Sequence, residues 1–133
     1  MKKLLYIILG LVFVTSFASC NRTPEEVNYD ASQLYGKWQE GSVFECYYSS
    51  LIERVLPNDD TVHVNGTTWD EDEVIGEEEA QLFNWTLTGA TLTHEHISTF
   101  VVVPKVYTIT ELNDNRLTYK DAYGETHHFS KVK

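Results

Sequence analysis

The stretch Phe83-Asn84-Trp85-Thr86-Leu87-Thr88-Gly89-Ala90-Thr91-Leu92-Thr93 decides the fold class of this chain. Apolar and polar residues alternate along positions 83–88, as they do in a strand that buries one of its two faces. A turn signal follows at Gly89-Ala90, and the alternation then resumes. The stretch therefore predicts an antiparallel hairpin.

The rest of the chain repeats this pattern on both sides of the hairpin. Further strands are predicted around 34–38, 44–56, 94–103, 106–112, 116–120 and 125–132, with Pro104 ending the third of these. Turn signals at 57–60 and at Asn65-Gly66 leave the register between 50 and 69 open. We expect an all-β fold, an up-and-down antiparallel eight-stranded β-barrel, because closure removes exposed sheet edges. A two-sheet sandwich is the alternative.

The N-terminus has the features of a secretion signal. Lys2 and Lys3 precede an apolar run of eleven residues, 4–14, which is too short for a membrane span of about 20 residues. The segment Thr15-Ser16-Phe17-Ala18-Ser19-Cys20 then resembles a bacterial lipobox, whose cysteine is acylated, for example with palmitate, after cleavage. We predict a lipoprotein signal peptide over 1–19, a lipidated N-terminus and flexible tether over 20–33, and one barrel domain over 34–133.

Charge and cysteine content restrict the partners of the mature chain. The formal net charge is −10 for the full sequence, and loss of Lys2 and Lys3 makes it −12 for the mature chain. This makes nucleic acid a poor partner, so we expect the N-terminal lipid to be the contact with the membrane. If Cys20 carries lipid, Cys46 has no second cysteine to pair with, and its aromatic neighbours favour a buried, inert side chain. We expect a monomer.

No pattern of residues points to catalysis. Serine, histidine and aspartate are present, but no nucleophile lies on a recognisable elbow, so we predict no catalytic residues and no enzyme. His94 and His96 share one face of a strand, and His127-His128 lies near the C-terminus. Zinc needs three or four converging ligands, so we expect solvent-facing or hydrogen-bonded histidines, no metal and no cofactor. The acidic run from Asp70 to Glu79 is expected to be a solvated loop.

The large apolar side chains of the predicted strands have two possible roles. An eight-stranded barrel is either filled by side chains or holds one small ligand. In the first case these residues form the core, and in the second they line a cavity for an apolar or aromatic molecule. The candidates for lining such a cavity are Phe83, Trp85, Leu87, Tyr107, Tyr119 and Phe129.

Several motifs resemble those of one known group. Gly36-Lys37-Trp38 matches the Gly-X-Trp signature of lipocalins, in which the tryptophan closes one end of the barrel, and this makes Gly36 and Trp38 the barrel-end motif. The ordered series continues through 66–70, 83–87, 104–110 and 123–132, and it resembles the small lipocalin-like lipoproteins of gut-type bacteria. One departure is that lipocalins place an arginine against the motif tryptophan, whereas the last strand here offers Lys131 and Lys133.

The resemblance implies a place in the cell and a function. It implies an outer-membrane lipoprotein, periplasmic or surface-exposed, whose lipocalin-like barrel binds a small apolar or aromatic molecule. The alternative is a structural or interaction module with a solid barrel, which contacts a protein or glycan partner at the cell surface.

Overall fold

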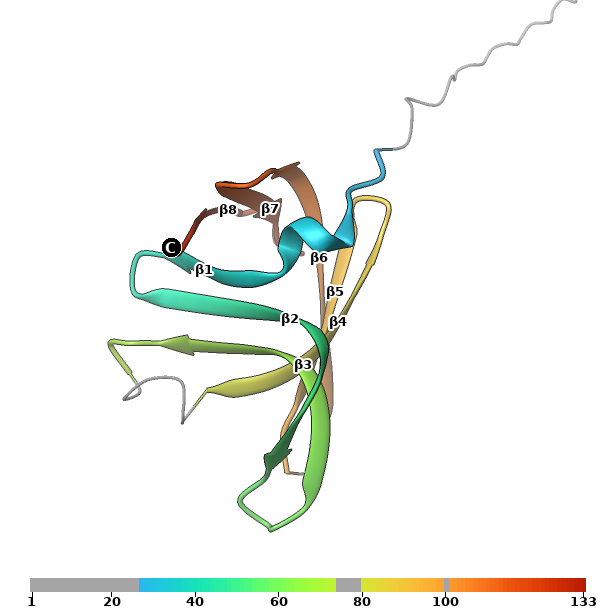
Figure 1. Cartoon of the computed structure of the whole chain (residues 1–133), viewed down its shortest axis with the longest axis vertical. Helices are drawn as coiled ribbons and strands as arrows, with labels where there is room; N and C mark the ends of the chain where they lie inside the picture. Colours follow the sequence, from blue (N-terminus) through green and yellow to red (C-terminus); the bar gives the residue numbers. More distant parts are fainter. Residues whose placement is uncertain (1–26, 74–79, 100) are drawn as a thin grey trace, which may run out of the picture.

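The chain folds into one closed barrel of antiparallel strands. The computed structural model describes residues 27–73, 80–99 and 101–133, so the predicted signal peptide and Cys20 lie outside the described residues. Each strand pairs with its neighbours in sequence, and pairing of the first strand with the last closes the barrel (Figure 1). This confirms the predicted eight-stranded up-and-down topology. Within the described part of the chain, no helix is both long enough and apolar enough to span a bilayer.

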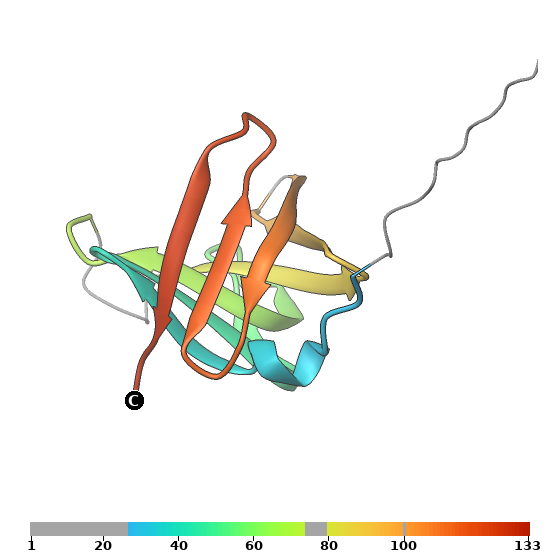
Figure 2. The ribbon, with the colours of Figure 1, turned by 90° about the horizontal axis from the view of Figure 1, so that it is seen from above.

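The elements follow one another with short connections, except around the residues that are not described. They are η1 (Ala31–Leu34), β1 (Gly36–Glu40), β2 (Val43–Val55), β3 (Thr61–Asp70), β4 (Gln81–Thr88), β5 (Thr91–Ile97), β6 (Val102–Leu112), β7 (Arg116–Lys120) and β8 (Thr126–Lys131). Seen from above, β6, β7 and β8 run across the other strands, so the flattened barrel has two layers with the core between them (Figure 2).

The turn between β2 and β3 lies at the first of the two predicted signals. Residues 56–60 connect the two strands, whereas Asn65 and Gly66 lie inside β3. The pairing shifts between Tyr47 and Ile52, where β2 has extra residues opposite β3. Beyond this bulge the two strands leave the barrel as a projecting ribbon, here named the hairpin arm (residues 48–64; Figure 1). A bulge bends its strand and increases the twist, which explains the change of direction.

The prediction of one strand over 94–103 is wrong at its C-terminal end. β5 stops at Ile97, and Pro104 lies inside β6, opposite Glu95. The chain turns between these strands, where the backbone N–H of Ser98 donates to the carbonyl of Val101 at 3.0 Å. Pro104 is tolerated because β7 pairs with β6 only from Thr108 onward, so this part of β6 is an edge strand.

Asn65 joins β3 to β4 at the point where the hairpin arm diverges. Its side-chain oxygen accepts from the Trp85 N–H at 2.8 Å, and its amide donates to the Trp85 carbonyl at 3.2 Å. The Asn65 carbonyl also accepts from the Trp85 indole at 2.9 Å. The Asn65 side chain thus makes the two hydrogen bonds to Trp85 that a backbone partner would make in a regular antiparallel pair.

We expect Asn65→Ala to lower the free energy of unfolding by about 2 kcal/mol, because two half-buried backbone groups of Trp85 lose their partners. Urea unfolding followed by far-UV circular dichroism measures the change. Asn84→Ala is the matched control, since among the described residues the Asn84 side chain makes one bond, which it accepts from the Asn65 N–H at 3.2 Å. An equal loss in both variants would contradict the role given to Asn65.

One end of the barrel is closed by η1 and Trp38. Leu34 and Trp38 are fully buried, and the Trp38 indole donates to the Leu34 carbonyl at 2.8 Å. Lys131 places its Nζ atom 4.5 Å from the centre of the Trp38 ring and donates to the Tyr35 carbonyl at 2.8 Å. A lysine of the last strand therefore packs against Trp38 at the closed end.

The folded region begins before residue 34. Tyr29 and Ala31 pack against the core, and the Tyr29 N–H donates to the carbonyl of Gly89 in the β4–β5 turn at 3.2 Å. Part of the predicted tether over 20–33 is therefore attached to the closed end of the barrel.

Candidate functional site

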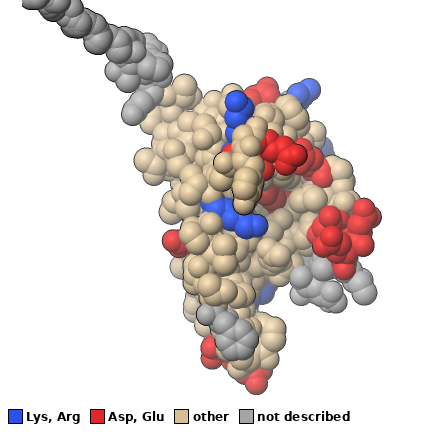
Figure 3. Space-filling view, turned by 180° about the vertical axis from the view of Figure 1, so that it is seen from behind, with Lys and Arg blue, Asp and Glu red and all other residues tan. Residues whose placement is uncertain are grey.

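The other end of the barrel is polar and open. It is formed where β1, β3, β5 and β7 end and where β2, β4, β6 and β8 begin, and we name it the mouth. An open cleft of about 240 Å³ lies there, lined by Val43, Thr68, Trp69, Asp70, Glu73, Gln81, His96 and Lys105. The rear face of the molecule has acidic and basic side chains close together (Figure 3). The two ends of the barrel thus differ in chemistry.

A carboxyl group is buried beneath the mouth. Glu45 is 5% exposed, and both of its oxygens accept hydrogen bonds from tyrosines, from Tyr47 at 2.6 Å and from Tyr119 at 2.7 Å. Bonds this short are typical of a hydroxyl donating to a carboxylate. The Tyr47 hydroxyl also lies 2.9 Å from Nε2 of His94. Glu45, Tyr47, Tyr119 and His94 therefore form one connected polar network inside the barrel.

Counting donors fixes the tautomer of His94 when Glu45 is ionised. The single hydroxyl hydrogen of Tyr47 goes to Glu45, so the Tyr47 oxygen must accept from Nε2–H of His94. The other ring nitrogen, Nδ1, is then an acceptor, and no described residue donates to it. If Glu45 instead gains a proton and donates it to Tyr47, the hydroxyl turns to Nε2 and Nδ1 carries the hydrogen. The network can therefore transfer a proton from the carboxyl to the far side of the imidazole.

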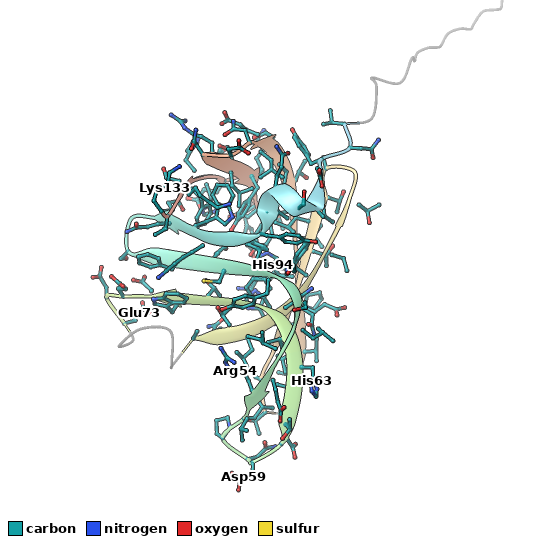
Figure 4. The ribbon with its side chains drawn as sticks, viewed as in Figure 1. Arg54, Asp59, His63, Glu73, His94 and Lys133 are labelled. Atoms are coloured by element: carbon teal, nitrogen blue, oxygen red, sulfur yellow. The ribbon has the colours of Figure 1, made fainter. Side chains whose placement is uncertain are left out.

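Aromatic packing holds the two inward-facing histidines of β5. The His94 ring stacks on Phe83 with centroids 4.1 Å apart, and His96 stacks on the same ring at 5.3 Å. Nδ1 of His96 lies 3.2 Å from the side-chain oxygen of Gln81. Figure 4 shows His94 within the body of the barrel and His63 out on the hairpin arm. Of the two predicted roles, solvent-facing or hydrogen-bonded, His94 and His96 have the second, and His94 is fully buried.

Burial shifts the pKa values of this network toward neutral side chains. Desolvation raises the pKa of Glu45, and the two tyrosine hydrogen bonds oppose that shift. Desolvation lowers the pKa of His94 well below its usual value, and His96 and Lys105 add to the effect. The pKa of His96 falls to about 4 through desolvation and the charge of Lys105. Both imidazoles are therefore neutral at pH 7.

We expect Glu45→Gln to change how stability depends on pH. In the unfolded chain the carboxyl ionises near pH 4.5, whereas in the barrel its pKa is raised. Above pH 4.5 the unfolded state therefore binds fewer protons, and the wild type loses stability relative to the variant with a slope of up to about 1.4 kcal/mol per pH unit. Urea unfolding of both proteins between pH 4.5 and 8 measures the difference. Parallel curves would show that the pKa of Glu45 is not raised.

A second polar group lies at the edge of the mouth. His127 is placed between two carboxylates, with Nδ1 3.1 Å from Glu40 and Nε2 3.0 Å from Asp121. Burial of the ring opposes protonation, but the bonds to Asp121 and Glu40 outweigh it and raise the pKa of His127. Asp121, Glu125 and His127 also have ligand atoms within 4.8 Å of one another. His127 is therefore explained as an ion-paired side chain that links β8 to β1.

The predicted ligand-lining residues pack against one another. Phe83, Trp85, Tyr119 and Phe129 belong to the buried core, and Leu87 and Tyr107 pack against it. Tyr47 contacts Phe83 and Trp85 edge-on, with ring centroids 5.7 and 5.6 Å apart. These contacts favour the filled-barrel role for the half of the interior next to η1. Cys46 is buried, as expected.

Glu45, Tyr47 and Gln81 are site residues that were not predicted from the sequence. The signal for Glu45 is its place in Phe44-Glu45-Cys46-Tyr47-Tyr48, where a carboxylate interrupts an aromatic run at the same parity as Tyr47. Phe44, Cys46 and Trp69 instead form a separate cluster, with Lys37 over the rings of Phe44 and Trp69. Because side chains alternate between the two faces of a strand, Glu45 lies on the same face as Tyr47, inside the barrel.

Comparison with known protein families, curated proteins and solved structures found no match to this chain. The fold and the site define it as an antiparallel barrel with one closed end and one polar, open end.

Proposed function

We propose that this chain is a lipocalin-like lipoprotein of the bacterial outer membrane and that it binds a small molecule at the mouth of its barrel. The observation that carries the proposal is the contrast between the two ends, because η1 and Trp38 fill one, whereas a cleft over a buried polar network opens at the other. Small-molecule sites are concave and have a few fixed polar groups. The lipid anchor rests on the sequence around Cys20.

The position of the polar groups favours a small polar ligand over the apolar ligand expected from the sequence. The aromatic residues proposed to line a cavity are packed together, whereas His96, Gln81 and Lys105 line the cleft. Lys105 is exposed and makes no ion pair with the described residues, so it is available to a carboxylate or another anion. An anionic ligand with a hydrogen-bond donor would complement both the ammonium and the neutral imidazoles.

Native mass spectrometry of the full-length protein tests this proposal. The protein is extracted in detergent from its own membranes, and part of the sample is treated with EDTA. We expect a small organic adduct that survives EDTA and is depleted at least tenfold in Lys105→Glu. The exposed Lys120→Glu is the matched control and should keep the adduct. Wild type that stays bare, even after incubation with a metabolite extract of the same cells, would contradict small-molecule binding.

The anchor has a separate test. Cys20→Ser should move the protein from the membrane fraction to the soluble fraction and abolish incorporation of labelled palmitate. A variant that stays in the membrane would contradict lipidation at this cysteine.

A specific observation favours the alternative, an interaction module with a solid barrel. Val102, Val103 and Val106 of β6 are exposed, and this part of β6 has β5 on one side but no β7 pairing on the other. An unpaired edge strand with apolar side chains can accept a strand from a protein partner. Bare wild type in the mass spectrum, together with a protein cross-linked to β6 in whole cells, would favour this alternative.

A further inference from the structure

Two imidazole nitrogens at the floor of the mouth have lone pairs that no described residue uses. His94 is fully buried, and its Nδ1 atom has no hydrogen-bond partner. Nε2 of His96, two residues along the same strand, is also buried and has none. Most buried polar atoms in folded proteins are paired. Two unpaired nitrogens at successive inward positions of one strand therefore point to a ligand.

The second nitrogen of each ring is already engaged, and this determines which nitrogen is the acceptor. When Glu45 is ionised, Nε2 of His94 donates to the Tyr47 hydroxyl, whose hydrogen goes to Glu45, and Nδ1 of His94 is the acceptor. Nδ1 of His96 donates to the Gln81 oxygen at 3.2 Å. Metal-binding histidines have this arrangement, with one ring nitrogen held by an oxygen acceptor and the other on the ion. The acceptor behind His94 is the Tyr47 hydroxyl, which is itself hydrogen-bonded to the Glu45 carboxyl group.

The spacing of the rings is slightly larger than, and close to, the spacing expected for one shared ion. Their centroids are 5.6 Å apart, and their planes meet at 39°. Two imidazoles on a tetrahedral zinc ion, each bound at about 2.0–2.1 Å, have centroids roughly 5 to 5.5 Å apart. Stacking of both rings on Phe83 holds them in this arrangement before any ion arrives.

We propose that His94 and His96 bind one divalent transition-metal ion of the zinc type, with Tyr47 as a positioning residue behind His94. Two protein ligands leave positions open for water or for a small molecule in the cleft. Lys105 lies opposite His94 in the β5–β6 register and favours an anionic donor there. We predicted no metal from the sequence because it does not show whether three or four ligands converge. The metal site goes beyond the proposed function and does not depend on it.

The test uses the full chain in detergent, stripped with EDTA and titrated with Zn²⁺ by calorimetry and with Co²⁺ by visible absorption. We expect one ion per chain, with an affinity that falls more than 100-fold in His96→Gln and in His94→Gln. Tyr47→Phe keeps both imidazoles and should lose 10- to 100-fold, as do other variants that remove a residue hydrogen-bonded to a metal ligand. His63→Gln, at an exposed position on the hairpin arm, is the matched control and should bind normally.

Far-UV circular dichroism of each variant separates lost binding from lost folding. His96→Gln is the decisive variant if His94→Gln unfolds, because His96 is only partly buried. Absence of Zn²⁺ binding by the wild type would overturn the proposal. Binding that persists in His96→Gln but disappears in His127→Gln would also overturn it and would place the ion at the Asp121, Glu125 and His127 cluster. A failed metal titration would leave the EDTA-resistant adduct of the proposed function unaffected.

Discussion

Trp38→Ala is expected to lower the free energy of unfolding by about 3–5 kcal/mol, the range found for removing a large buried aromatic side chain. Trp38 is fully buried, and loss of its side chain opens the closed end of the barrel. It also removes the indole bond to Leu34 and the contact with Lys131. A small barrel has a total stability of about 5–15 kcal/mol. We therefore expect a large shift of the urea midpoint, measured by far-UV circular dichroism.

A matched pair of conservative changes separates the hydrogen bond from the packing. Trp38→Phe keeps an aromatic ring but removes the donor to Leu34, so it should cost at least about 1 kcal/mol more than Trp69→Phe. Trp69 is similarly buried, but its indole nitrogen has no partner among the described residues. Equal costs for the two phenylalanine variants would show that the Trp38 hydrogen bond does not contribute to closing the barrel.

Gly66→Ala is expected to cost about 3 kcal/mol, at the upper end of the range for overpacking a core. A Cβ atom at this position would lie closer than 3.0 Å to three atoms of the Phe83 ring. That ring cannot retreat easily, because it is fully buried and stacked on His94. Urea unfolding gives the cost, and near-UV circular dichroism reports whether the aromatic packing changes.

A double-mutant cycle tests this cause. Phe83→Leu frees space next to residue 66, so Gly66→Ala combined with Phe83→Leu should cost at least about 1 kcal/mol less than the sum of the single changes. Gly124→Ala is not a suitable control, because Gly124 has a φ of +84° and its substitution is strained for another reason. Additive costs in the cycle would rule out the clash with Phe83 as the reason for a glycine in β3.

The topology could be predicted from the sequence because each strand carries its own signal. The alternation at Phe83, Trp85 and Leu87 and the turn at Gly89 correspond to β4, β5 and the hairpin between them. The errors lie where long-range pairing overrides a local signal. Asn65-Gly66 is a strong turn pair, yet it lies inside β3, where Asn65 binds β4 and Gly66 makes room for Phe83. Neither partner is close to it in sequence.

The candidate site was harder to predict than the fold, and for the same reason. Glu45, Tyr119 and His94 come from three different strands, and only closure of the barrel brings them together. Local sequence shows that His94 and His96 share a face, but it does not show which face is inside. In the closed barrel both imidazoles stack on the buried Phe83, so the face that carries His94 and His96 is the inner one.

The attachment of the N-terminal segment at Gly89 determines how the barrel would face the bilayer. Tyr29 is bonded to the β4–β5 turn, which lies at the opposite end of β4 and β5 from Gln81 and His96. If Cys20 carries the lipid, the eight residues from there to Asn28 span at most about 30 Å, and Tyr29, which follows them, is held at the closed end. The mouth would then point away from the lipid. If the mouth binds a small molecule, as we propose, that molecule would reach it from the aqueous phase and not from the membrane that holds the anchor.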